Sequence, residues 1–462
     1  MEMQRDIKSL VEAVDQRGGR AMLVGGCVRD ELRGVEAKDF DIEVFGIAAV
    51  ELRAILEQLG NVNVVGEAFT VYKLGGNLDV SLPRKDRKTE RGHKGFVVEG
   101  DPEMSFEDAA RRRDFTINAI MKDAKTGEII DPFGGRADLR ARVLRAVDRA
   151  TFPEDPLRAL RAAQFAARFE FAISPETIEL CKAVDVSELA AERIWGELEK
   201  ILLKAEKPSI GLRWLYDLEI VARIFPELAA LKGVPQEPEW HPEGDVDVHT
   251  LLVVDEARKL IDDLAFAKRV SVMLGALCHD FGKPATTKFL DDRWRSLGHE
   301  EAGVAPTESF LNRLNLYTLR GFDVRKQVVE LVRHHLKPGM FYNVRGEIGD
   351  GAFRRLARKV EPDLLYRVAK ADSLGRNAPW VPKENWFDAE PMEWFIKRCR
   401  ELDVENNPPT PLLGGRHLIE FGLKPSPEFG RILNSVYELQ LDGTVTTLVD
   451  AKREAMKLIE FQ

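Results

Sequence analysis

The stretch LVGGCVRDELRGVEAKDFDIEVFG, residues 23–46, brings a glycine pair and two closely spaced aspartates together near the start of the sequence. Its first two residues predict the end of a short strand, and Gly25 and Gly26 predict a tight turn that side chains would block. Residues 28–32 then predict a first helical turn, whose free N–H groups suit a phosphate beside Arg29. The stretch therefore predicts a strand, a turn and a helix start that together favour phosphate binding.

A strand pattern with acidic side chains follows the turn. Residues 39–45 alternate acidic and apolar side chains with the two-residue period of a strand, so Asp39 and Asp41 lie on one face. Two like charges this close repel each other unless a cation lies between them. Asp79, in the strand-like run NLDVSL, adds a third carboxylate if the two strands are neighbours.

Three converging carboxylates suit a pair of Mg²⁺ ions, which prefer oxygen ligands and bridge the oxygens of a triphosphate. The matching chemistry is in-line attack of a hydroxyl on an α-phosphate. The alternative is that Asp39, Asp41 and Asp79 are ordinary exposed strand residues.

Composition limits the class of protein. A chain of 462 residues predicts three or four domains, and 44% hydrophobic with 31% charged residues is typical of a soluble globular protein. We expect no membrane span and no signal peptide. The four cysteines are scattered, which indicates reduced thiols in the cytoplasm. The net charge of −9 does not by itself predict a nucleic-acid partner, although residues 111–168 are locally basic, which is enough for phosphate contacts.

The chain changes character after Pro153. Before it, strand candidates occur at 21–24, 39–45, 62–65, 70–74, 77–82, 96–98 and 117–121. The charged stretch 84–105 predicts a mobile loop. After Pro153 the apolar spacing is helical, and two Pro-rich connectors, 233–245 and 377–391, interrupt it. We therefore expect an α+β fold, with a mixed sheet first and all-helical domains afterwards.

A pair of charged residues at a helix start is suited to reading a nucleobase. In EDPLRALR, Asp155 and Arg158 lie three residues apart and share a helix face. The carboxylate accepts from an exocyclic amine and the guanidinium donates to the neighbouring ring nitrogen. Cytosine and adenine present this pattern, whereas uracil and guanine present it reversed. The pair would accept CTP and ATP, but an ordinary surface ion pair is the commoner alternative.

Five motifs in order carry a family resemblance across about the first 205 residues. After the opening stretch come RRRDFTINAI (111–120), DPFGGRADLRARVLR (131–145), EDPLRALRAAQFAARF (154–169) and ERIWGELEKIL (192–202). Together they resemble the class II tRNA nucleotidyltransferases and the related bacterial poly(A) polymerases.

This resemblance assigns roles to residues of the head. It implies that Asp39 and Asp41 hold Mg²⁺, that Asp79 helps to activate the primer hydroxyl, and that Asp155 and Arg158 read the base. Three further residues would face the triphosphate, namely Gly25, Gly26 and Arg29.

Other matched positions have less specific roles. Arg113, Asp114 and Asn118 match regular positions of the family motif and would contact the nucleotide or organise the fold. Arg161 would contact phosphate or brace the base-reading pair, and Arg193 would brace the base-reading helix or serve only the fold.

Histidines gather in the second helical block. Five segments that carry histidine or aspartate follow one another, namely DVDVHT, CHDFGKP, SLGHEEAG, VRHHLKP and AKADSLGR. Imidazole and carboxylate ligands together suit a divalent transition metal. The members of this group that resemble the HD phosphohydrolase signature are His249, His279, Asp280 and Asp372. The resemblance implies Ni²⁺, Mn²⁺ or Co²⁺ acting on a phosphate and a bound water. His299 and one of the neighbours His334 and His335 would extend the site to a second metal. The alternative is a helical scaffold that retains ligands without activity.

The last segment resembles the C-terminal part of HD-containing bacterial tRNA nucleotidyltransferases, through PLLGGRHLIEFGLKPSPEFGRIL (411–433). The expected domains are a nucleotidyltransferase head, a helical neck with the nucleotide-reading helix, an HD domain and a helical tail that contacts tRNA. Their expected bounds are 1–148, 149–232, 240–378 and 385–462.

The expected function is template-free addition of C, C and A to tRNA 3′ ends from CTP and ATP, with an additional phosphohydrolase activity in the HD domain. An enzyme that adds only A, or only the two Cs, would share nearly every motif. A bacterial poly(A) polymerase would share the head, but no long basic C-terminal extension is present. A phosphohydrolase with an RNA-binding head is the alternative from another class. We expect no DNA partner, and the oligomeric state stays open.

Overall fold

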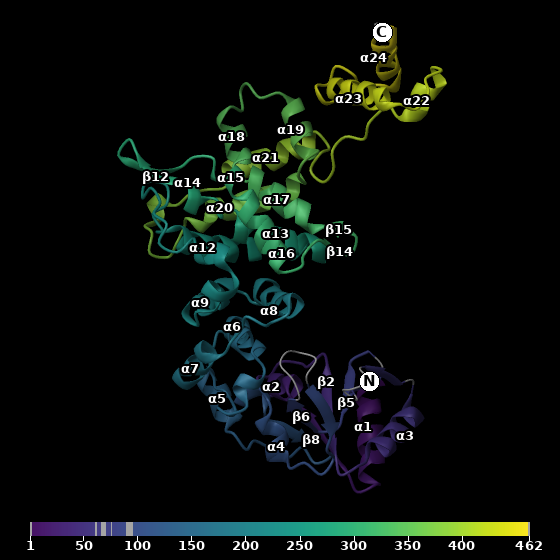
Figure 1. Cartoon of the computed structure of the whole chain (residues 1–462), viewed down its shortest axis with the longest axis vertical. Coiled ribbons are helices and arrows are strands. Elements are labelled where there is room, and N and C mark those ends of the chain that lie inside the picture. Colours follow the sequence, from purple (N-terminus) through teal and green to yellow (C-terminus); the bar gives the residue numbers. More distant parts are fainter. Residues whose placement is uncertain (1, 61, 66–70, 75, 89–95, 461–462) are drawn as a thin grey trace. The chain divides into compact units, whose positions relative to one another are not determined.

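The computed structural model describes residues 2–60, 62–65, 71–74, 76–88 and 96–460 (Figure 1). The chain divides into two compact units. The first unit comprises Met1–Glu197 with Trp214–Ile224, and the second comprises Leu198–Arg213 with Phe225–Gln462.

A seven-stranded sheet organises the first unit, in the order β3-β4-β5-β2-β1-β8-β9. β2 and β5 run parallel, and the other neighbouring pairs run antiparallel, which confirms the expected mixed sheet. The strands are β1 (Arg20–Val24), β2 (Phe40–Phe45), β3 (Val62–Val65), β4 (Val71–Leu74), β5 (Leu78–Ser81), β8 (Met121–Asp123) and β9 (Ile129–Ile130).

The two faces of this sheet differ in chemistry. Helices α1 (Glu2–Asp15) and α3 (Ala49–Leu59) pack on one face, where Ile42 and Val44 of β2 are buried. The intervening β2 residues, Asp41 and Glu43, point to the opposite face because strand side chains alternate. Helices α2 (Gly26–Leu32) and α4 (Phe106–Arg111) also belong to the head.

Two local predictions for the head differ from the structure. The strand predicted at 117–121 begins only at Met121 as β8, because residues Thr116–Asn118 form the 3-10 helix η1. The predicted loop at 84–105 contains an antiparallel ribbon of β6 (Arg84–Lys88) and β7 (Phe96–Gly100). Residues 89–95 of that prediction lie outside the described residues.

Helices follow the sheet, as the change after Pro153 predicts. α6 (Leu157–Phe169) buries a nearly continuous apolar side, and the residue that caps its C-terminus, Glu170, adopts a positive φ of 54°. The other elements are α5 (Gly135–Ala141), β10 (Val143–Leu144), η2 (Phe152–Glu154), β11 (Ala172–Ile173), α7 (Pro175–Ala183), α8 (Ala191–Lys204), α9 (Pro208–Asp217) and α10 (Ile220–Ile224).

Four helices form the centre of the second unit. They are α12 (Val246–Arg258), α13 (Phe266–Cys278), α17 (Val324–His334) and α20 (Pro362–Gly375), and α13 is apolar on almost every side. Two short ribbons, β12 (Thr287–Leu290) with β13 (Arg293–Ser296) and β14 (Thr318–Leu319) with β15 (Phe322–Asp323), make this unit mostly rather than entirely helical. The remaining elements are α11 (Pro226–Ala229), α14 (Lys283–Thr286), α15 (His299–Ala302), α16 (Val304–Arg313), α18 (Lys337–Asn343), α19 (Asp350–Ala357), η3 (Lys383–Asn385) and α21 (Glu390–Glu401).

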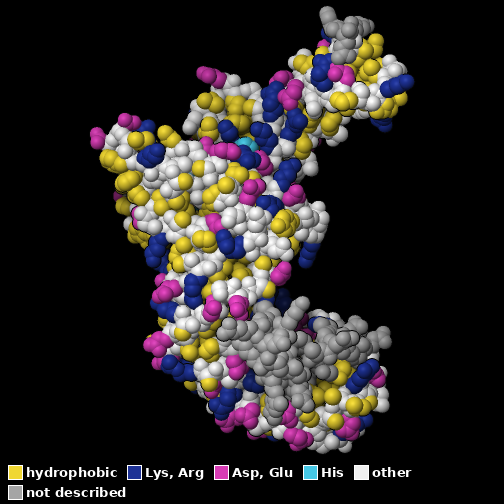
Figure 2. Space-filling model, in the orientation of Figure 1, with side chains coloured by type: hydrophobic (Ala, Val, Ile, Leu, Met, Phe, Trp, Pro, Cys, Tyr) yellow, Lys and Arg dark blue, Asp and Glu magenta, His cyan; other side chains and the backbone are white. Residues whose placement is uncertain are grey.

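The C-terminal helices have a small core of their own, in which Ile432, Val436 and Ala451 are buried. These helices are α22 (Gly415–Glu420), α23 (Pro427–Leu441) and α24 (Leu448–Glu460). Figure 2 shows Lys and Arg side chains intermixed with Asp and Glu over the visible face. None of the helices in the described part of the chain has the length and apolar character that a membrane crossing requires.

Candidate functional site

The acidic residues of the head gather where three strands meet. Asp41 on β2 lies directly opposite Asp79 on the parallel strand β5. On its other side Asp41 is opposite Val24, the last residue of β1, so the glycine turn begins next to it. Asp39 immediately precedes β2 and is exposed. The structure therefore brings the predicted carboxylates and the turn together.

These carboxylates affect one another's charge. The pKa of Asp41 is raised above its usual value, because neighbouring protein atoms partly desolvate it and because Asp79, Glu43 and Asp39 add negative charge. Arg113 acts in the opposite direction. Oxygen donors with an excess of negative charge fit Mg²⁺, which stabilises them as neighbouring ions.

Gly25 must be glycine for two reasons. Its φ is +71°, a conformation that L side chains rarely adopt. A Cβ at this position would also lie 2.9 Å from a guanidinium nitrogen of Arg113. The other terminal nitrogen of Arg113 donates to Glu43 at 2.6 Å, which fixes the guanidinium above the turn. Gly26 follows as the first residue of α2.

A buried chain of hydrogen bonds links α2 to α6. Arg29, which is 4% exposed, donates to the side-chain oxygen of Asn118 at 2.7 Å. The Asn118 amide donates to Asp114 at 3.0 Å, and Arg161 donates to the second Asp114 oxygen at 2.8 Å. Burial acts to raise the pKa of Asp114, but Arg161 and Asn118 outweigh it and hold the pKa below its usual value. Four predicted nucleotide-binding residues thus form one network.

The predicted base-reading residues have separate partners. Asp155 follows η2, and both of its carboxylate oxygens accept from Arg193, at 3.0 and 2.9 Å. Arg158 donates to the backbone oxygens of Thr151 at 2.8 Å and of Arg112 at 2.6 Å. Arg193 therefore contacts the base-reading segment directly, which is the contact that a bracing role requires.

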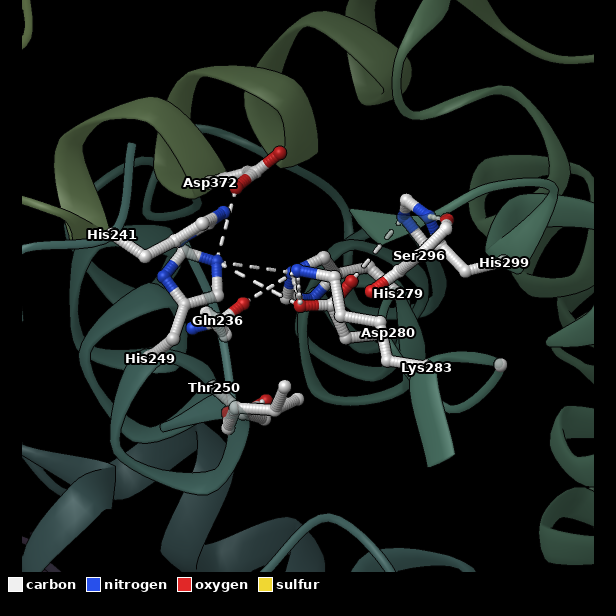
Figure 3. A network of polar contacts seen from close by, with 12 residues as sticks. Gln236, His241, His249, Thr250, His279, Asp280, Lys283, Ser296, His299 and Asp372 are labelled. Atoms are coloured by element: carbon white, nitrogen blue, oxygen red, sulfur yellow. Dashed lines mark hydrogen bonds and ion pairs between the residues drawn. The ribbon is translucent and has the colours of Figure 1, made fainter. Parts of the chain in front are cut away.

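A second cluster joins three helices of the second unit (Figure 3). His249 Nε2 on α12 lies 3.1 Å from Asp372 on α20 and 3.3 Å from Nε2 of His279, which follows α13. Ligand atoms of these three buried residues lie within 4.8 Å of one another. Asp280, next to His279, also lies 3.9 Å from His249 Nε2.

A second metal-ligand group adjoins the first one. Asp280, His299 and His335 also present atoms within 4.8 Å of one another. Nε2 of His299 lies 3.4 Å from Asp280 and 3.2 Å from Nε2 of His335. His334 points elsewhere, with its Nε2 3.2 Å from Glu330. The geometry therefore favours His335 over His334 as a ligand.

The protonation of these rings favours metal binding. Nδ1 of His279, His299 and His335 lies 2.8, 2.7 and 2.6 Å from a backbone carbonyl oxygen, so each Nδ1 carries the proton. Each Nε2 is then an acceptor, and the close Nε2 pair of His299 and His335 cannot form a hydrogen bond. A cation between the rings removes this repulsion, so the donor set fits a divalent transition metal.

Sequence reasoning missed two buried residues next to this cluster. Glu243 lies 2.7 Å from Nδ1 of His249 and 2.9 Å from Nδ1 of His241. Glu243 and His241 precede α12 in a Pro-rich connector, where the sequence has no periodicity that predicts the direction of a side chain. Lys283 was also missed; it pairs with Asp280 at 2.8 Å, and its position three residues later on a helical pattern was the available signal.

Three family models match successive parts of the chain. Residues 21–145 match the model described as the poly A polymerase head domain. Residues 170–232 match the probable RNA and SrmB-binding site of polymerase A, and residues 246–377 match the HD domain.

Curated relatives match over most of their length. The "Multifunctional CCA protein" of Xanthomonas campestris pv. campestris is 39% identical over 376 residues, which are 78% of this chain and 87% of the relative. The protein of the same name from Actinobacillus pleuropneumoniae is 36% identical over 394 residues, 83% of this chain and 92% of the relative.

Solved structures share the fold at low identity. The Bacillus stearothermophilus CCA-adding enzyme in complex with CTP matches with a TM-score of 0.64 and 20% identity, covering 100% of this chain and 98% of that one. The Thermotoga maritima CCA-adding enzyme in complex with tRNA matches with a TM-score of 0.55 and 21% identity, covering 98% and 94%.

Proposed function

The chain belongs to the family of multifunctional CCA proteins, and on that premise we propose that it adds C, C and A to tRNA 3′ ends from CTP and ATP. The observation that carries this function is the pairing of Asp41 with Asp79 beside the Gly25 turn, within a head that matches the family model. The match of residues 170–232 to an RNA-binding model supports RNA as the second substrate.

In the reaction the primer 3′ hydroxyl attacks the α-phosphate, and pyrophosphate leaves. Asp39 and Asp41 would hold Mg²⁺, which would supply positive charge to the attacking and leaving oxygens. Asp79 would accept the hydrogen bond of the primer hydroxyl, orient its oxygen and help to activate it by taking up its proton as the new O–P bond forms. A side chain at position 25 would collide with Arg113, so Gly25 keeps both the turn and the space in front of it open for the triphosphate.

Behind the turn, the buried network keeps the nucleotide site in place. Arg29 and Asn118 hold the start of α2, and Asp114 and Arg161 connect it to the base-reading helix. These residues hold the backbone in place, and that backbone in turn positions the triphosphate and the sugar. Gly26 is the first residue of α2.

Base choice depends on Asp155 and Arg158. Both groups are already held by neighbours, Asp155 by Arg193 and Arg158 by two backbone oxygens, so little ordering is needed when a base binds. A preorganised acceptor and donor would favour cytosine and adenine over uracil and guanine.

Replacement of the metal-binding carboxylates tests the head. Asp39→Ala and Asp41→Ala should abolish nucleotide incorporation and leave tRNA binding nearly intact, because RNA affinity comes mostly from phosphate contacts elsewhere. Measurable incorporation by either variant at ordinary Mg²⁺ concentration would refute the assignment.

Three tRNA primers separate complete from partial addition. They end before the first C, after one C and after two Cs, and receive CTP and ATP separately and together. A complete enzyme extends all three to CCA. Extension of only the third primer would identify an A-adding enzyme, extension that stops after two Cs would identify a CC-adding enzyme, and long A tails would identify a poly(A) polymerase.

We propose a second activity, hydrolysis of phosphoesters, for the HD domain. His249, His279 and Asp372 would hold one transition metal, and Asp280, His299 and His335 a second. A bound metal lowers the pKa of water, and Lys283 and Arg376 place positive charge beside Asp280 and Asp372.

The proposal also includes a role for the C-terminal helices and a location in the cell. The C-terminal helices would contact the tRNA, through residues 411–433. A cytoplasmic location agrees with a tRNA substrate and with four free, buried cysteines.

A further inference from the structure

Glu243 is a buried carboxylate behind the histidine cluster that no step described above uses. It lies just before α12 and is 4% exposed. Its Oε1 lies 2.7 Å from Nδ1 of His249, within ion-pair distance, and accepts a hydrogen bond from Nδ1 of His241 at 2.9 Å. Nε2 of the same His249 ring points to Asp372 and His279 (Figure 3). Glu243 is therefore one imidazole ring away from the metal-ligand group.

Among the described residues, two histidine rings are the polar partners of the Glu243 carboxylate. Lys283 pairs with Asp280, and Arg376 lies 3.7 Å from Asp372. In the described part of the chain Glu243 has no Lys or Arg within ion-pair distance, and its Oε2 has no hydrogen-bond partner. Burying an ionised carboxylate is costly unless polar partners and positive charge offset the cost, and here the two histidines provide part of that offset. A divalent cation on the far side of the His249 ring would supply that charge.

We propose that Glu243 is a positioning residue that strengthens metal binding through His249. A carboxylate 2.7 Å from Nδ1 favours the tautomer with the proton on that nitrogen, which leaves Nε2 as the atom that would bind the metal. Its negative charge also makes the imidazole a stronger donor. This inference rests on the metal role proposed for His249, His279 and Asp372, but it does not depend on hydrolysis.

Two neighbours hold the carboxylate in this orientation. His241 donates a hydrogen bond to the carboxylate, and its ring packs edge-on against His249 with centroids 4.9 Å apart. Trp380 Nε1 donates to the backbone oxygen of Glu243 at 3.3 Å. The position of Glu243 is thus fixed from its side chain and from its backbone, as expected for a group that orients a ligand.

Metal titration of the full chain tests this role. Metal-free protein is titrated with Co²⁺ in the presence of a competing chromogenic chelator, and the visible spectrum of bound Co²⁺ reports its coordination. Glu243→Gln keeps the volume and an acceptor oxygen but loses the charge, so affinity should fall about tenfold. Glu243→Ala loses both, and affinity should fall toward about a hundredfold, with a changed spectrum.

Glu239→Gln is the matched control. Glu239 lies in the same connector but is exposed and pairs with Arg293 at 2.8 Å, so this variant should bind Co²⁺ like the wild type. The metal-free melting temperature and nucleotide addition by the head show whether a variant is misfolded. If Glu243→Ala is misfolded, the Co²⁺ affinity of Glu243→Gln alone decides the test.

Equal Co²⁺ affinity in the wild type, Glu243→Gln and Glu243→Ala would overturn the role of Glu243 while leaving the metal site in place. Failure of the wild type to bind Co²⁺ or Ni²⁺ would overturn the metal site itself and this inference with it. A graded loss confined to Glu243 supports the proposal whether or not a hydrolysed substrate is found.

Discussion

Lys73 on β4 lies directly opposite Asp79 on β5, and its Nζ is 2.9 Å from both carboxylate oxygens. The ammonium group thus engages both oxygens of the carboxylate that we expect to orient the primer hydroxyl. Both side chains are partly exposed, at 45% and 35%, so the pair contributes only about 0.2–1 kcal/mol. A pair this weak can exchange for another cation during the reaction.

Removing Lys73 should free both carboxylate oxygens of Asp79 for the primer hydroxyl and for cations. In Lys73→Met the acidic face formed by Asp79 and the neighbouring Asp41 loses a positive charge, so it should attract Mg²⁺ more strongly, and the Mg²⁺ concentration for half-maximal CTP incorporation should fall by at most about fivefold. Lys122→Met is the control, because Lys122 pairs with Glu31 elsewhere on the head. A higher Mg²⁺ requirement in Lys73→Met would show that Lys73 supports the reaction instead.

Base discrimination should depend on Arg193 although it need not touch the base. Arg193→Ala frees the Asp155 carboxylate, and the preference for CTP over UTP should fall roughly tenfold or more, since a hydrogen bond to a charged group is worth about 1.5–3 kcal/mol. Arg149→Ala, which removes an exposed pair with Glu179, should leave the preference unchanged. The measurement is incorporation of each nucleotide at matched concentrations. An unchanged preference in Arg193→Ala would show that Asp155 is positioned without it.

The periodic parts of the head could be predicted from the sequence. Alternation through residues 39–45 located β2 and the shared face of Asp39 and Asp41, since a strand's side-chain period leaves little choice. The turn at Gly25 followed from the need for a positive φ. The local pattern did not decide whether the strand that carries Asp79 is a neighbour of β2, and the family resemblance supported that arrangement.

Contacts between distant segments could not be predicted in the same way. The bond of Asp155 to Arg193 joins residues 38 positions apart; resemblance indicated that Arg193 braces the base-reading helix or serves the fold, but no spacing identified Asp155 as its partner. Glu243 lies in a connector without periodicity, so nothing in the sequence directs its side chain toward His249. Tertiary packing decides both cases.

The ion pair of Asp114 with Arg161 should make the head sensitive to acid. The native pKa of Asp114 is below its usual value, so the ionised carboxylate stabilises the fold above about pH 4. This contribution is lost as the pH falls below that value and through the lower native pKa. Asp114→Asn should therefore cost about 3 kcal/mol or more at pH 7 and progressively less below pH 4.

Hydrogen exchange of peptides from residues 111–120 and 157–169 measures this effect in the full chain, by comparing variant and wild type at each pH. Asp138→Asn is a useful control, because its partner Arg145 is more exposed. A difference between Asp114→Asn and wild type that stays constant from pH 7 to pH 3 would contradict the role of the ionised carboxylate.

The two proposed metal centres should respond separately to metal removal and to mutation. After chelation, Mg²⁺ alone should restore nucleotide addition, because Asp39, Asp41 and Asp79 offer oxygen donors, whereas phosphoester hydrolysis should require Ni²⁺, Co²⁺ or Mn²⁺. His279→Ala should abolish hydrolysis, since His279 borders His249 and Asp280, and should leave CTP incorporation within about twofold. His334→Ala is the matched control, because His334 faces Glu330 rather than the cluster. Hydrolysis that survives His279→Ala, or that disappears equally in His334→Ala, would contradict this assignment of ligands. If no phosphoester is cleaved with any of these metals while Co²⁺ still binds, the HD domain is a metal-binding scaffold, and the residues of the cluster then serve the fold.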